Sequence, residues 1–161
     1  MIISKDRFKK FCLFLLCCAL VGFLIFCLTQ YIEDFSLQGD PKIEEIKLKI
    51  APLFSKNIKH TGILEVINNR DIMNEIDIYK GDKSYTINKE KVYLCLKDEH
   101  GEYYNDNLLI FVTLHELSHV ISDTIGHDKK FNNIFDQLLK KATELNIYDP
   151  KLPIDQNYCT Y

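Results

Sequence analysis

The stretch Asn107–Ser122, NLLIFVTLHELSHVIS, decides the fold of this 161-residue chain. Its apolar residues recur at helical spacing and form two stripes instead of one. The stripes consist of Ile110, Leu114, Leu117 and Ile121, and of Leu108, Phe111 and Val112. A helix at the surface of a domain needs only one apolar face, so two stripes predict a helix that is buried on both sides. We expect this segment to be the central helix of the domain.

The same helix carries the motif H-E-x-x-H, from His115 to His119. Residues four apart on a helix stand about 40° apart around its axis, so both imidazoles project from one face and can bind one zinc ion. Glu116 points about 100° away from His115, where it can reach a metal-bound water without being a ligand. As core residues alone, these side chains would cost desolvation energy and give no stability. We therefore predict His115 and His119 as zinc ligands and Glu116 as the catalytic base.

A catalytic zinc ion needs a third protein ligand and keeps one position open for water. His127 is the preferred candidate, because it follows Gly126, where the left-handed conformation open to glycine would end the helix and turn the chain back. Carboxylates on or near the following helix are the competing candidates, namely Asp123, Asp128 and Glu144. The remaining histidines, His60 and His100, lie in polar stretches and are expected at the surface.

Together, the motif at 115–119, the run Gly126-His127-Asp128 and Phe131 resemble the WLM and SprT-like group of zinc metallopeptidases over about residues 85–140. The resemblance implies that His115, His119 and His127 bind zinc and that Glu116 is the general base. Seven residues separate His119 from His127, which is more than the WLM pattern has. Members of the group that act on DNA-crosslinked proteins carry basic regions, and this chain has none, so their substrate is not carried over.

The N-terminus contains an uncharged apolar run, Phe11–Leu28, which is long enough for a membrane span. A cleaved signal peptide is the alternative, but its apolar part usually has about 7 to 15 residues, and no small-x-small cleavage site follows here. Basic residues precede the run and acidic residues follow it: Lys5, Arg7, Lys9 and Lys10, then Glu33 and Asp34. The positive-inside rule therefore predicts a single-pass signal anchor with a cytosolic N-terminus and a non-cytosolic domain.

The remainder of the chain is acidic. Four of the 20 basic and one of the 23 acidic residues lie before residue 30, which leaves a formal net charge of −6. A nucleic-acid partner is therefore not expected. Four of the six cysteines lie in the apolar run, and the other two, Cys95 and Cys159, are too few for a disulfide scaffold; the sequence leaves open whether they pair.

Around the central helix, Asp40 and Pro41 are typical of a helix start, so a helix is predicted from about 41 to 51. Short branched or aromatic runs predict strands at 62–67, 84–88 and 92–96. Asp128 can cap a final amphipathic helix that ends at Asp149-Pro150. The fold class is thus α+β: a small zincin-like domain with a central active-site helix, a short antiparallel sheet and a C-terminal helix, preceded by one transmembrane helix.

These predictions divide the chain into a basic cytosolic N-terminus (1–10), a transmembrane signal anchor (11–29), a linker (30–40) and a metallopeptidase-like domain (41–161). The expected function is a membrane-anchored zinc metallopeptidase, a hydrolase that cleaves a peptide or protein substrate with a zinc-activated water. An extended substrate is expected to pair with the strand at 92–96. The alternative is a non-catalytic anchored module with a structural zinc ion, which Cys95 or Cys159 would close as a fourth ligand.

Overall fold

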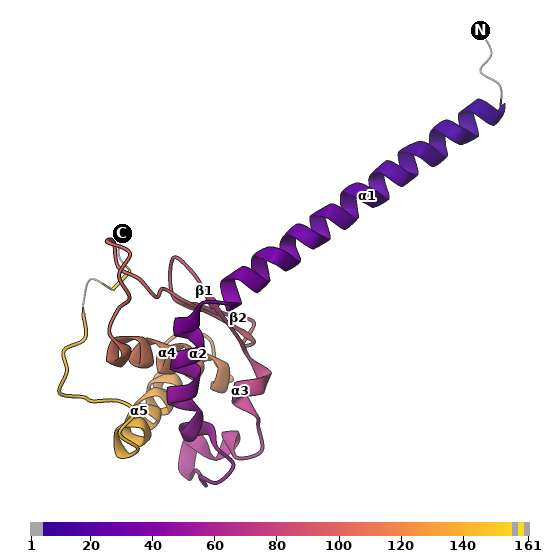
Figure 1. Cartoon of the computed structure of the whole chain (residues 1–161). Coiled ribbons are helices and arrows are strands. Elements are labelled where there is room, and N and C mark those ends of the chain that lie inside the picture. Colours follow the sequence, from indigo (N-terminus) through magenta and orange to yellow (C-terminus); the bar gives the residue numbers. More distant parts are fainter. Residues whose placement is uncertain (1–4, 156–157, 160–161) are drawn as a thin grey trace. The chain divides into compact units, whose positions relative to one another are not determined.

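The computed structural model describes residues 5–155, 158 and 159, and the chain separates after Ser36 into an N-terminal helix and a domain (Figure 1). Helix α1 spans Lys5–Gln38. Its segment Lys9–Ile32 has 24 residues with a mean hydropathy of 3.0, which makes it long and apolar enough to cross a membrane. The helix continues to Gln38, so most of the segment 30–40, predicted as a linker, is helical.

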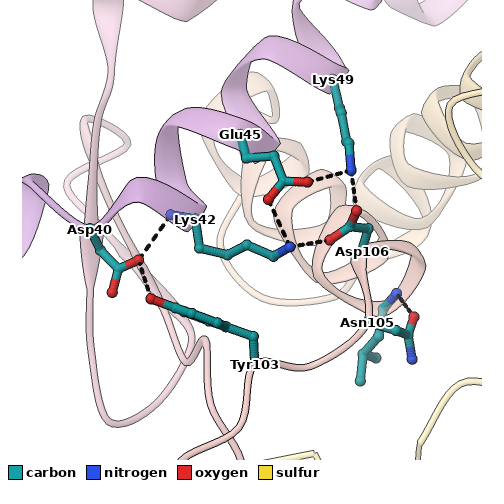
Figure 2. A network of polar contacts seen from close by, with 8 residues as sticks. Asp40, Lys42, Glu45, Lys49, Tyr103, Asn105 and Asp106 are labelled. Atoms are coloured by element: carbon teal, nitrogen blue, oxygen red, sulfur yellow. Dashed lines mark hydrogen bonds and ion pairs between the residues drawn. The ribbon is translucent and has the colours of Figure 1, made fainter.

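Helix α2, Pro41–Ile50, begins as predicted, with Asp40 accepting a hydrogen bond from the Lys42 amide at 2.9 Å. A polar network then joins α2 to Asp106, the first residue of α4 (Figure 2). Lys42 and Lys49 each contact both Glu45 and Asp106. Burial alone would raise the pKa of Asp106, but the two lysines hold it below its ordinary value. This network fixes the start of the central helix against α2.

The sheet has three strands: β1 at Asp77–Lys80, β2 at Tyr85–Ile87 and β3 at Lys91–Leu94. Its order is β1-β3-β2; β2 pairs antiparallel with β3, and β1 pairs parallel with β3. The predicted antiparallel sheet is therefore wrong in one respect, because β1 was not foreseen and makes the sheet mixed. Strand β3 is also central, so it cannot be the edge to which a substrate pairs.

The segment Gly62–Ile67, predicted as a strand, is instead the 3-10 helix η2. Gly62 has φ +65°, and the buried side chains of Leu64 and Ile67 lie three residues apart, on one side of a 3-10 turn. In a strand, alternation would have placed the charged Glu65 on the same face as Ile67. The short elements η1 (Ala51–Phe54) and α3 (Ile72–Glu75) complete this part of the domain.

Helices α4 (Asp106–Ile121) and α5 (Lys129–Glu144) pack against each other, and α4 also contacts β2 and β3. Twelve of the sixteen residues of α4 are buried, which confirms the prediction from its two apolar stripes. Asp128 caps α5 by accepting a hydrogen bond from the Phe131 amide at 2.8 Å. Helix α5 ends at Glu144, before Asp149-Pro150, and Asn146 has φ +57° just beyond it.

Cys95 and Cys159 form a disulfide across a sequence separation of 64 residues. The bond joins the residue after β3 to the C-terminal segment, where Tyr158 donates a hydrogen bond to the carbonyl of Cys95 at 2.6 Å. The Tyr158 hydroxyl also lies 2.6 Å from Ser84 Oγ, immediately before β2. The disulfide thus holds the C-terminal segment against the hairpin of β2 and β3.

Replacing both Cys95 and Cys159 with alanine is expected to lower the free energy of unfolding by about 2–4 kcal/mol, because the disulfide restricts the unfolded chain. Urea unfolding of the full chain in detergent, followed by tyrosine fluorescence, measures the change. A reductant should destabilise the wild type by a similar amount and leave the double variant unaffected, since the four cysteines of α1 are free thiols. Coincident unfolding curves for the two proteins would contradict this prediction.

Candidate metal centre

Helix α4 places His115 and His119 on one face, with their ring centroids 5.2 Å apart. Each imidazole is partly buried, whereas the residues around them on the helix are almost all buried. This is the arrangement that the four-residue spacing predicts. The helix ends at Ile121, where the Ser122 amide donates a hydrogen bond to the Ser118 carbonyl at 2.9 Å.

The loop between α4 and α5 brings the third histidine back to the first two. Gly126 has φ +81°, as expected, but it lies five residues beyond the end of α4 and so does not terminate the helix. In the first turn of α5, Asn132 Nδ2 donates a hydrogen bond to the His127 carbonyl at 3.1 Å. His127 Nε2 then lies 2.9 Å from His115 Nε2. The seven residues between His119 and His127 exceed the spacing of the WLM pattern. The loop accommodates the extra residues, and α4 itself is not extended.

One ligand nitrogen from each of His115, His119 and His127 lies within 4.8 Å of the others. With a Zn–N bond of about 2.0–2.1 Å, two nitrogens on one ion lie at most about 4.2 Å apart, so the three imidazoles reach one ion after a small adjustment of their rings. Among the described residues, no other group of histidine, cysteine and acidic side chains has this arrangement. The triad can therefore hold a metal ion by its geometry.

The ring of Phe131 packs against all three histidines. It is 1% exposed, and its ring centroid lies 4.3 Å from that of His119, 4.7 Å from that of His127 and 5.0 Å from that of His115. Phe135, one turn further along α5, lies 5.2 Å from His115. These aromatic contacts restrict the imidazole rings, so α5 supports the triad even though it supplies none of its nitrogens.

The electrostatic surroundings favour neutral imidazoles, the form that binds metal ions. Burial lowers the pKa of His115 to about 4, and the neighbouring His119 and His127 contribute in the same direction. Burial also lowers the pKa of His119, and the nearby His127 and Lys89 lower it further. At neutral pH these two rings are therefore uncharged and can offer lone pairs.

Glu116 is 5% exposed and lies under strand β2. Thr86 Oγ1 donates to Glu116 Oε2 at 2.8 Å and also lies 3.1 Å from the Glu116 carbonyl. Burial raises the pKa of Glu116, while the hydrogen bond from Thr86 opposes that rise. Sequence reasoning did not identify Thr86, because the partners are 30 residues apart and nothing local to Thr86 marks it.

A cavity of about 590 Å³ opens beside these groups. Its lining includes the three histidines, Glu116, and Tyr85 and Thr86 from β2. A larger hollow of about 1070 Å³ lies between the start of α4 and the end of α5, and it contains none of the three histidines. The three histidines and Glu116 therefore share the smaller cavity.

The competing third ligands have other roles. Asp123 pairs with Lys130 at 2.7 Å, Asp128 caps α5, and Glu144 pairs with Lys141 at 2.9 Å. None of them belongs to the group that could hold a metal ion among the described residues.

The two remaining histidines also lie outside the triad. His100 is exposed as predicted. The prediction for His60 was wrong, because its ring is buried and bonds the Leu53 carbonyl at 3.0 Å. Burial lowers the pKa of His60.

The fold and this cluster define an α+β domain that carries an H-E-x-x-H helix and a converging third histidine. The chain is 35% identical over 155 residues to Uncharacterized protein 042R of Invertebrate iridescent virus 3, covering 91% of this chain and 98% of that protein. It is 45% identical over 119 residues to Uncharacterized protein 136R of Invertebrate iridescent virus 6, covering 72% and 67%. The chain belongs to the family of these viral proteins.

A more distant relative is Uncharacterized protein R325 of Acanthamoeba polyphaga mimivirus, 34% identical over 116 residues, which cover 68% of this chain and 58% of that protein. No established family profile matches the chain, and no solved structure matches it. The names of these relatives assign no activity to them.

Proposed function

We propose that this chain is a membrane-anchored, zinc-dependent peptidase with a zincin-like catalytic domain. The observation that supports the proposal is the convergence of three imidazole nitrogens within 4.8 Å, beside a buried carboxylate in an open cavity. In this proposal His115, His119 and His127 are the metal ligands and Glu116 is the general base.

The donor set suits zinc. Three neutral imidazoles match the ligand chemistry of a catalytic zinc site, and the cavity leaves space for a fourth, non-protein ligand. A bound zinc ion would supply Lewis acidity, which polarises the scissile carbonyl and lowers the pKa of an attacking water.

Glu116 supplies the proton transfer. Its carboxylate would accept the proton of the attacking water as the carbon–oxygen bond forms, and would then deliver that proton to the leaving amine as the carbon–nitrogen bond breaks. Low exposure suits this role, because burial raises the pKa of Glu116 and so makes its carboxylate a stronger base than that of an exposed glutamate.

Strand β2 is the element best suited to hold an extended peptide. It is an edge strand, it lines the cavity, and Thr86 at its centre contacts Glu116. An edge strand presents unpaired backbone groups to which a substrate can add as a further strand. This replaces the strand at 92–96 in the substrate hypothesis.

The rival function, a non-catalytic module with a structural zinc ion, has less support. A structural site usually has four protein ligands, and the two cysteines that could have completed it are joined in a disulfide.

The disulfide also bears on location. Disulfides persist in oxidising compartments, so a paired Cys95 and Cys159 favour a domain on the non-cytosolic side of the membrane. The basic residues before the apolar segment favour the same orientation, with the N-terminus in the cytosol. The proposed localisation is therefore a single-pass membrane protein with its catalytic domain outside the cytosol.

A metal titration of the full chain in detergent tests the proposed function. The protein is stripped with a chelator and reloaded with Zn²⁺, while thermal melting and casein cleavage are followed together. Zinc is expected to raise the melting temperature by several degrees, because ligands that bind only the folded state stabilise it, and to switch on cleavage. A structural site would raise the melting temperature alone, and no response in either measurement would reject a zinc site.

A further inference from the structure

We propose that Thr86 is a positioning residue for Glu116, holding its carboxylate in the orientation that proton transfer requires. This inference rests on the proposed function, because it assigns a role within the same site. Among the described residues, Thr86 provides the side chain that hydrogen-bonds the carboxylate of Glu116.

The register of the sheet explains why Thr86 reaches Glu116. Thr86 pairs with Val92, a core residue of β3, whereas Tyr85 pairs with Tyr93, and their rings stack at 4.7 Å on the opposite face. Successive residues of a strand point to opposite faces, so Thr86 lies on the face that packs against α4. Each residue of β2 therefore has a defined side, and only Thr86 is directed at the helix.

The two short distances from Thr86 Oγ1 have different consequences. The 2.8 Å hydrogen bond is made to Oε2 of Glu116, so Oε1 is the oxygen that would accept a proton from water. The Glu116 carbonyl, at 3.1 Å, is a second acceptor for the same single hydrogen, so either geometry of the hydroxyl joins β2 to α4 at Glu116. Carboxylate and strand are thus fixed to each other, although they come from distant parts of the sequence.

Strand β2 is itself held in place just before Thr86. Ser84 Oγ accepts a hydrogen bond from the Cys95 amide at 3.0 Å and lies 2.6 Å from the Tyr158 hydroxyl. The threonine therefore projects from an anchored segment, and its hydroxyl can act as a fixed reference for Glu116. Without that donor, the buried carboxylate loses the hydrogen bond that compensates for its desolvation. Its free energy then falls if it rotates into the cavity, towards water or towards the metal ion.

The test compares Thr86→Val, which keeps the branched shape and removes the donor, with Thr86→Ser, which restores it. In the zinc-loaded full chain, Thr86→Val is expected to lower kcat by about 10–100-fold, as for other residues that orient a metal-site group, with KM and zinc content unchanged. Thr86→Ser is expected to recover kcat to within a few-fold of the wild type.

Thr143→Val is the matched control. It removes the same hydroxyl from a threonine of α5 whose Oγ1 donates to the Leu139 carbonyl at 2.8 Å, and it is expected to leave kcat unchanged. Thr86→Ala, which also lacks the donor, serves as the second variant if Thr86→Val does not fold. A wild-type kcat in the variants that lack the donor overturns the positioning role.

A second readout does not depend on activity. Crystal structures of the zinc-loaded wild type and Thr86→Val proteins are expected to differ in the side-chain rotamer of Glu116. An unmoved Glu116 overturns the inference even where kcat falls. If the wild type cleaves no peptide, the proposed function fails, and the Glu116 rotamers still decide whether Thr86 positions this carboxylate.

Discussion

Replacing Glu116 with glutamine is expected to lower kcat/KM for peptide cleavage by about 10²–10⁴-fold, the usual contribution of a general base, while zinc stays bound. The amide keeps the shape of the side chain, and its oxygen can still accept the hydrogen bond from Thr86. It cannot take a proton from water. Because an amide costs less to bury than a carboxylate, the melting temperature should equal or exceed that of the wild type.

Zinc stoichiometry, measured by elemental analysis beside the kinetics, separates the roles that Glu116 could have. Glu144→Gln is the matched control, since Glu144 pairs with Lys141 on the surface of α5 and should leave both measurements unchanged. If Glu116→Gln loses stoichiometric zinc, Glu116 is a metal ligand and the assignment as base is wrong.

The elements that the sequence predicted well are those whose signals are local. The two apolar stripes of α4 and the capping aspartates before α2 and α5 all lie within a few residues of the structure they determine. The pairing of His115 with His119 follows from the helical repeat alone. This part of the candidate site therefore needed no tertiary information.

The elements that it predicted poorly depend on distant partners. Strand β1 has only four residues and pairs parallel with β3. It forms a strand because of a partner segment that begins 14 positions later in the sequence. The run at 62–67 has branched residues typical of a strand, yet the burial of Leu64 and Ile67 in the core sets a 3-10 period. Tertiary contacts decided both cases.

The supporting parts of the candidate site are non-local for the same reason. Thr86 meets Glu116 across 30 residues, and Cys95 meets Cys159 across 64. No periodicity in a single sequence marks either pair. Reasoning from residues thus identified the groups that would carry the chemistry, left the pairing of the two cysteines open and missed the contact of Thr86 with Glu116.

Replacing His127 with alanine is expected to weaken zinc binding by at least about 100-fold and to abolish cleavage, because two protein nitrogens remain where a catalytic site needs three ligands. The fold should survive the change. His127 is exposed, and the loop around it is held by the Asp128 cap and by Phe131 below. Competition with a fluorescent zinc chelator measures the affinity, and melting of the metal-free proteins checks that both are folded.

Two controls make the result specific to the triad. His100→Ala removes an exposed imidazole from a turn outside the triad, and Glu144→Ala removes a carboxylate that was a candidate ligand. Both should keep zinc affinity and activity close to those of the wild type. If His127→Ala instead retains full zinc and activity, the three-histidine site is falsified, and the carboxylates beside the loop, Asp123 and Asp128, become the leading candidates. Their present partners, Lys130 and the Phe131 amide, would then have to be given up when the metal binds, which predicts a change in the structure of the loop on adding zinc.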